Sequence, residues 1–176
     1  WAPITVGMLL SHMGGLEHRF ERTVEGVLLL DYSAEDMLQS ARETPMHSEP
    51  GTDWNYSDQG YFLLGVIVEQ VTGQSFADHM QETYFGPIGM TQTRFLDQSA
   101  IIPNRAEGYA FADGEVVRNR RVWQFGQTAH FGVTSTLSDL LLWEAELSDP
   151  QVINRDALEA TWPIQREFHA GENCDM

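Results

Sequence analysis

The chain contains no lysine, and its ten basic residues, all arginines, are outnumbered by 26 acidic residues. The formal net charge of −16 argues against binding to nucleic acids or anionic membrane surfaces, because both require clustered positive charge. The single cysteine, Cys174, excludes an internal disulfide. There is no run of 18 apolar residues, so the sequence predicts no membrane-spanning helix.

The histidines do not follow a metal-binding pattern. None of them has a second histidine and an acidic partner at the spacing of a known ligand motif. We therefore expect no metal site and no cofactor. The six histidines are His12, His18, His47, His79, His130 and His169.

Length and composition fit one ordinary domain or a piece of a larger one. The chain has 176 residues, of which 42% are hydrophobic, enough to build a core. It begins at Trp1, without an initiator methionine and without a charged-then-apolar leader. This beginning predicts a fragment or a processed product.

Apolar periodicity and capping residues predict a mainly helical chain. Thr5 is a candidate N-cap, Ser33 and Asp36 have the spacing of a capping box, and Gly73 is a candidate C-cap. The helix over 75–85 is expected to end at the Gly86-Pro87 pair. The expected helices cover residues 6–12, 33–43, 59–72, 75–85, 137–147 and 155–162.

One β-hairpin is predicted in the third quarter of the chain. Apolar residues over 109–111 and 116–117 flank Asp113-Gly114, a dipeptide that favours a tight hairpin turn. A single hairpin is too little to form a large sheet. The predicted fold class is therefore α+β, mainly helical, with one hairpin.

The segment from Pro50 to Asp58 carries the strongest chemical signal. It brings Tyr56 and Asp58 to the start of a long apolar helix. A helix N-terminus carries partial positive charge, which favours a phenolate or another developing anion. A tyrosine with a lowered pKa acts as a general base, so we interpret Tyr56 as a candidate proton-transfer residue.

Four segments in order resemble one family of enzymes. Each is weak alone, but together they are similar to the serine β-lactamase and penicillin-binding-protein-like hydrolases, especially class C β-lactamases and their esterase and D-peptidase relatives. The segments are 4–16 (ITVGMLLSHMGGL), 50–65 (PGTDWNYSDQGYFLLG) with its continuation to Gly73, 85–93 (FGPIGMTQT) and 131–143 (FGVTSTLSDLLLW).

The resemblance implies acyl transfer through a serine, with an ester, amide or β-lactam as substrate. Tyr56 matches the tyrosine of the family's Tyr-x-Asn motif, which implies a general base. Asp58 departs from the usual asparagine, and its charge is expected to raise the pKa of Tyr56, which is unfavourable for a base. We predict Tyr56 and Asp58 as catalytic residues and Phe131 and Gly132 as substrate-binding residues, although Phe131 also fits an ordinary core aromatic.

The family's nucleophile and its lysine come from a Ser-x-x-Lys helix, which a chain without lysine cannot contain. The Lys-Thr-Gly or His-x-Gly strand is also not found. The resemblance thus implies that residues 1–176 are a single, incomplete domain, the helical centre of the hydrolase without its flanking sheet strands. Such a fragment is expected to be inactive alone.

Other readings stay open at this point. A non-catalytic relative kept as a binding or scaffold domain is the main alternative, and an unrelated helical interaction protein is disfavoured by the four ordered motifs. The expected partner is a small-molecule or peptide substrate, while the choice among lactam, ester and D-peptide and the oligomeric state stay open. Family resemblance implies a periplasmic or extracellular location.

Overall fold

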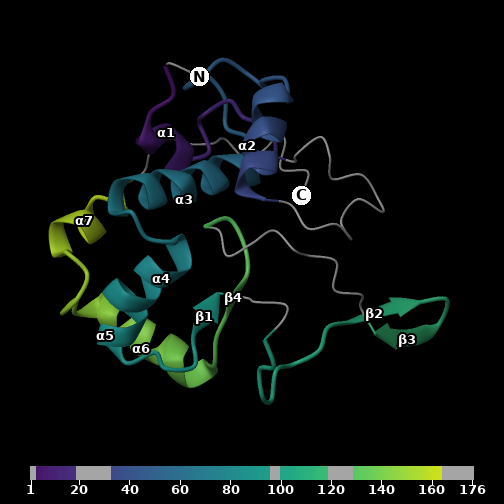
Figure 1. Ribbon diagram of the computed structural model, residues 1–176, viewed down its shortest axis with the longest axis vertical. Helices are drawn as coiled ribbons and strands as arrows, with labels where there is room; N and C mark the ends of the chain where they lie inside the picture. Colours follow the sequence, from purple (N-terminus) through teal and green to yellow (C-terminus); the bar gives the residue numbers. More distant parts are fainter. Residues whose placement is uncertain (1–2, 19–32, 96–99, 119–128, 164–176) are drawn as a thin grey trace. The chain divides into compact units, whose positions relative to one another are not determined.

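The computed structural model describes residues 3–18, 33–95, 100–118 and 129–163 (Figure 1). It confirms the predicted fold class, because the described residues form helices with a hairpin and a second short strand pair. The chain divides into two compact units. The first comprises residues 1–77 and 95–134, and the second comprises residues 78–94 and 135–176.

Three helices form the frame of the first unit, and each begins at a side-chain cap. In α1 (Val6–Leu10) the Thr5 hydroxyl accepts from the Met8 amide, and α2 (Ala34–Glu43) begins with the predicted capping box. Helix α3 (Asp58–Thr72) is capped by Ser57 and ends at Gly73, whose φ of 70° is left-handed. These caps satisfy amides that a helix leaves without partners.

Helices α1 and α2 both contribute to packing around α3 (Figure 1). Phe62 of α3 is fully buried, and it clusters with Met37 and Ala41 of α2. Burying a large apolar side chain such as Phe62 or Met37 stabilises the fold by about 1.5–3 kcal/mol. The cluster fixes the first half of α3, the part of the helix that carries Asp58.

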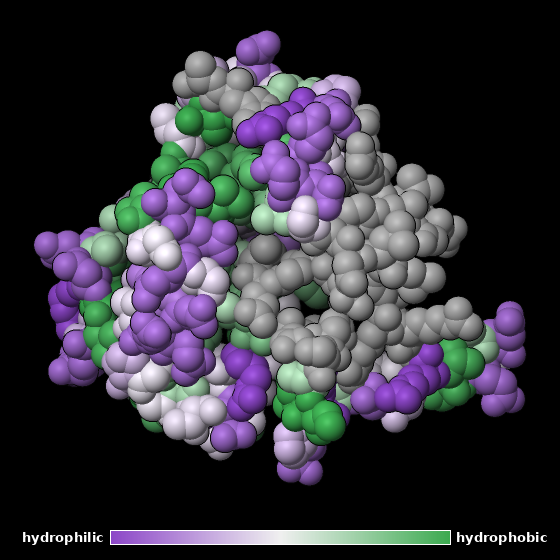
Figure 2. Space-filling model, in the orientation of Figure 1, coloured by the Kyte–Doolittle hydropathy of each residue, from purple (hydrophilic) through white to green (hydrophobic). Residues whose placement is uncertain are grey.

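The predicted hairpin is confirmed. Strand β2 (Tyr109–Ala112) pairs antiparallel with β3 (Glu115–Arg118). Asp113 and Gly114 turn the chain with φ of 52° and 84°, the double positive φ of a type I′ turn. All eight strand residues are exposed, and Figure 2 shows hydrophobic and hydrophilic residues mixed along the hairpin. A second pair joins β1 (Arg94–Phe95) to β4 (Val133–Thr134).

The helical run after α3 corrects one prediction. It comprises α4 (Phe76–Met80), the π-helical turn η2 (Gln81–Phe85) and α5 (Gly86–Ile88). The chain therefore does not leave the helix at Gly86-Pro87. Proline is tolerated there because it occupies the first turn of α5, where its missing N–H is not needed. The run ends at Gly89, which has a φ of 90°.

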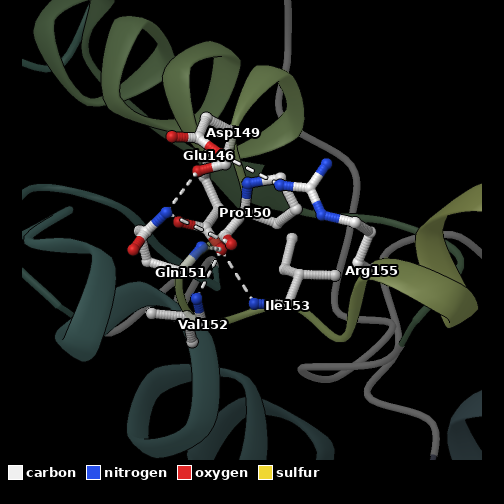
Figure 3. Close-up of polar contacts among 7 residues, drawn as sticks. All are labelled: Glu146, Asp149, Pro150, Gln151, Val152, Ile153 and Arg155. Carbon is white, nitrogen blue, oxygen red and sulfur yellow. Dashed lines mark hydrogen bonds and ion pairs between the residues drawn. The ribbon is translucent and has the colours of Figure 1, made fainter.

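A buried carboxylate organises the end of the second unit. Glu146 lies on α6 (Leu137–Ser148) with only 6% of its surface exposed. Its Oε1 accepts hydrogen bonds from the amides of Gln151, Val152 and Ile153 at 2.9, 2.7 and 2.8 Å (Figure 3). These bonds lower the pKa of the carboxyl. They hold the corner that leads to α7 (Arg155–Glu159).

Candidate active site

Tyr56 and Asp58 lie together, as the sequence predicts. Tyr56 precedes α3 and is 49% exposed, and Asp58 is the first residue of that helix. The Asp58 carboxylate is close enough for its negative charge to act on the Tyr56 phenol. The phenol is therefore accessible at the surface, where a reacting group has room to approach it.

Ser57 fixes the backbone between these two residues. Its hydroxyl accepts from the Gly60 amide at 3.1 Å and donates to the Glu17 carbonyl at 2.7 Å. Its own amide donates to Nδ1 of His12 at 3.1 Å. Segments about 40 residues apart in sequence thus hold the peptide that presents Tyr56 and Asp58.

Aromatic and imidazole rings surround the Tyr56 phenol. The ring of His12 lies 4.6 Å from that of Tyr56 and stacks on Tyr61 at 4.9 Å, and the ring of His18 lies 5.0 Å from Tyr56. Burial lowers the pKa of His12 more than the Asp58 charge raises it. A neutral His12 fits the hydrogen bond that its Nδ1 accepts. His12 is therefore a hydrogen-bonded, packed histidine.

The ionisation of Tyr56 is unfavourable in this environment. Partial burial raises the pKa of its hydroxyl, and the negative charge of Asp58 raises it further. The direction expected from the Asp58 charge is confirmed. A phenol in this state keeps its proton at neutral pH, so work as a base requires a cation nearby.

His130 connects the second predicted pair, Phe131 and Gly132, to this region. It packs edge-on against Phe62 of α3 at 5.9 Å between ring centroids. Burial lowers the pKa of His130, and the Asp58 charge opposes that change. Phe131 is 44% exposed, and Gly132 has a left-handed φ of 94°. Tyr56 and Asp58 thus lie next to each other, whereas Phe131 and Gly132 simply follow His130, whose ring packs on α3.

Sequence reasoning missed the role of His18 and His130 as neighbours of Asp58. His18 Nδ1 lies 3.9 Å from the Asp58 carboxylate, and the Asp58 charge acts to raise the pKa of His130. Their positions, 40 residues before and 72 residues after Asp58, give no spacing signal. Within the described ranges, no group of three or more His, Cys, Asp or Glu side chains is arranged to hold a metal. Nor do these ranges contain a helix long and apolar enough to cross a membrane.

Comparison with known proteins identifies the family. A model of the Beta-lactamase family matches residues 1–171. Penicillin-binding protein 4* of Bacillus subtilis (strain 168) is 28% identical over 189 residues, covering 98% of this chain and 41% of the relative. The D-aminopeptidase of Brucella canis is 29% identical over 147 residues, covering 77% of this chain and 26% of the relative.

The solved structures agree with these relatives. The crystal structure of D-amino acid amidase from Ochrobactrum anthropi SV3, complexed with D-phenylalanine, matches with a TM-score of 0.76 and 26% identity. The match covers 89% of this chain and 48% of the amidase. The fold is that of the β-lactamase-like and penicillin-binding-protein-like hydrolases. The chain belongs to the Beta-lactamase family, and it spans less than half the length of these relatives.

Proposed function

We propose that the intact protein is a serine hydrolase that cleaves the amide bond of a D-amino acid derivative or short D-peptide through an acyl-serine. The observation that carries the proposal is that the half-exposed Tyr56 lies beside Asp58 at the start of α3. The D-amidase and D-aminopeptidase relatives support an amide substrate over a lactam or an ester.

In the proposed reaction Tyr56 moves one proton at a time. As the serine hydroxyl attacks the carbonyl carbon, its proton passes to the Tyr56 phenolate. The C–N bond then breaks, and the amine leaves with that proton. Water attacks the acyl-serine, gives one proton to Tyr56, and the proton returns to the serine oxygen as the free acid departs.

The nucleophile is proposed to come from polypeptide outside these 176 residues, since a chain without lysine has no Ser-x-x-Lys pair. The lysine of that pair would also supply the cation that lowers the pKa of Tyr56. We propose that both units belong to one incomplete β-lactamase-related domain. Residues 1–176 alone are therefore proposed to be inactive. Export to the periplasm or the cell exterior is proposed from the likeness to penicillin-binding proteins alone.

The test of the base is the Tyr56→Phe substitution in the intact protein. We expect kcat/KM for D-phenylalanine amide to fall by about 10²-fold to 10⁴-fold, the usual contribution of a general acid–base group. Tyr61→Phe is the matched control, because its hydroxyl donates to the Leu10 carbonyl at 3.1 Å. That control should cost about 1 kcal/mol of stability and leave the rate nearly unchanged. A Tyr56→Phe rate within about threefold of the parent would contradict the assignment.

The alternative is a non-catalytic binding or scaffold domain. The Asp58 departure from asparagine and the raised pKa of Tyr56 favour it, because both hinder base catalysis. The intact protein distinguishes the two. An acyl-enzyme trapped with a D-amino acid ester and detected by mass supports the hydrolase, and a chain with no reactive serine supports the scaffold.

A further inference from the structure

His12 occupies a helix end where glycine is the usual residue. It follows Ser11, the C-cap of α1, and its φ of 57° is left-handed. Its amide donates to the Leu9 carbonyl at 3.3 Å. The Met13 amide donates to the Met8 carbonyl at 2.7 Å, which completes the pair of bonds of a Schellman motif. Because glycine adopts this conformation without strain and other residues seldom do, a histidine here points to a function for its side chain.

His12 holds the chain on both sides of Tyr56. Its carbonyl accepts from the Asn55 amide at 3.0 Å, and its Nδ1 accepts from the Ser57 amide at 3.1 Å. The ring of His12 also lies 4.6 Å from the ring of Tyr56, between centroids. A single residue at the end of α1 therefore binds the residue before the phenol, binds the residue after it and contacts its ring.

The bond to Nδ1 differs from the other long-range bonds of this segment. The Asn55 side chain donates to the Leu16 carbonyl at 2.8 Å, and the Ser57 hydroxyl donates to the Glu17 carbonyl at 2.7 Å. Every residue has a backbone carbonyl, so these two bonds do not depend on which residues stand at positions 16 and 17. The bond from the Ser57 amide requires an acceptor atom in the side chain at position 12, so it depends on residue type.

Only the neutral form of His12 can make this bond. An imidazole nitrogen accepts a hydrogen bond when it carries no proton, and both nitrogens are donors in the charged ring. Burial lowers the pKa of His12, the Asp58 charge opposes that change, and the His18 charge adds to it. The Tyr61 ring stacks on the imidazole at 4.9 Å, and its hydroxyl is fixed by the Leu10 carbonyl. These neighbours keep the ring neutral and oriented toward Ser57.

We propose that His12 is the positioning residue for the Tyr56 base, because its Nδ1 holds the Ser57 amide and so fixes the peptide that carries the phenol. This inference rests on the proposed hydrolase function and adds a residue to that site. A general base must lie within about 2.6–3.2 Å of the atom whose proton it takes. A misplacement of about 1 Å costs as much as about 10²-fold in rate. Loss of the bond should therefore lower kcat more than it affects KM.

Two substitutions separate the side-chain bond from the left-handed backbone. Asparagine and glycine both tolerate this conformation, but only His12→Asn keeps an acceptor near Nδ1, because both atoms are bonded to Cγ. In the intact protein, well below its melting temperature, we expect His12→Gly to lower kcat for D-phenylalanine amide by about tenfold or more and to change KM less than about twofold. His12→Asn should keep kcat within about threefold of the wild type.

Asp113→Gly is the matched control, because Asp113 is an exposed residue of the hairpin turn whose φ of 52° is also left-handed. It should leave kcat and KM unchanged. Equal losses of kcat in His12→Asn and His12→Gly would show that the bond is not what matters, and would overturn the inference. A His12→Gly kcat within about threefold of the wild type, or a loss confined to KM, would also overturn it.

Hydrogen exchange of the Ser57 amide in the same intact proteins separates the possible failures. This amide should exchange slowly in the wild type and in His12→Asn, and about tenfold faster or more in His12→Gly. If the wild type hydrolyses no amide but exchange follows this order, His12 holds the Tyr56 segment and the hydrolase proposal fails. If the wild type is active and His12→Gly changes neither kcat nor exchange, the positioning role is overturned and the hydrolase stands. Equal exchange in all three proteins overturns the inference whatever the rates.

Discussion

Ser57 shows how much a single residue fixes in this site. As an N-cap it could be predicted from the sequence, because a serine just before an apolar helix is a usual cap. Its bonds to the Glu17 carbonyl and to Nδ1 of His12 could not be predicted, since no local pattern records which distant segment packs beside a helix start. The cap and these two bonds together determine where the Tyr56 hydroxyl lies.

The site residues that were predicted lie close together in the sequence, and those that were missed come from distant segments. Tyr56 and Asp58 are two positions apart, so the sequence itself places them together. His18 comes close to Asp58, and the Asp58 charge affects the pKa of His130, only because of tertiary packing. A lone histidine in a sequence is more often an ordinary polar residue, and neither of these two had a motif to distinguish it.

Buried His130 should make stability depend on pH. Burial lowers its folded-state pKa below the ordinary value of 6.5, so the unfolded chain binds the proton first as the pH falls. Stability is therefore retained above about 6.5 and lost as the pH falls from there toward the lowered pKa. We expect the melting temperature of the intact protein to drop between pH 7 and pH 5, and to drop less in His130→Gln. Equal drops in both proteins would exclude His130 as a source of the effect.

At the scale of elements, α3 contains two glycines with opposite surroundings. A Cβ added at Gly65 would lie 3.0 Å from the Ala129 Cβ and 3.1 Å from its backbone nitrogen. A Cβ at Gly60 would meet nothing closer than 3.7 Å. The close approach at Gly65 is what lets the segment that carries His130 and Phe131 pack on the helix.

This contrast predicts different outcomes for the same substitution on one helix. Gly60→Ala should stabilise the intact protein by about 0.5–1 kcal/mol, because alanine restricts the unfolded chain and favours helix. Gly65→Ala should destabilise it by about 1–3 kcal/mol, since overpacking against Ala129 exceeds the helical gain. Urea unfolding measures both changes. A Gly65→Ala protein as stable as Gly60→Ala would show that the 129–131 segment moves away freely.

Most elements could be predicted from capping residues and periodicity, and the exceptions are instructive. The hairpin and the starts of α2, α3 and α6 follow local signals, which the structure confirms. The prediction at Gly86-Pro87 was wrong, because this pair was interpreted as the end of a helix and the helical run continues through it. In the structure the π turn of η2 lets the chain begin a new helix, with Pro87 in its first turn.

At the scale of the whole molecule, net charge is the dominant feature. The value of −16 implies self-repulsion that destabilises the compact state. Described ion pairs such as Arg155–Asp149 and Arg118–Glu107 are largely exposed, and each contributes about 0–1 kcal/mol. Added salt screens both effects, and we expect the relief of repulsion among the excess acidic residues to outweigh the weakening of these few surface ion pairs.

Salt should accordingly stabilise the protein. We expect the melting temperature of the intact protein to rise by about 2–4 °C between roughly 20 mM and 300 mM salt, because the Debye length falls below the spacing of many surface charges. Sodium and potassium chloride should act equally, since screening depends on ionic strength. A fall in melting temperature would mean that attractive ion pairs dominate.

The carboxylate of Glu146 links the residue type at position 146 to the length of the corner that follows α6. Its Oε1 meets three consecutive amides of the corner before α7. An insertion or deletion between residues 148 and 151 would move those amides off the oxygen, and an aspartate at position 146 would be one methylene too short to reach them. Among homologues, a glutamate at this place should therefore accompany a corner of this one length, and the two should be lost together.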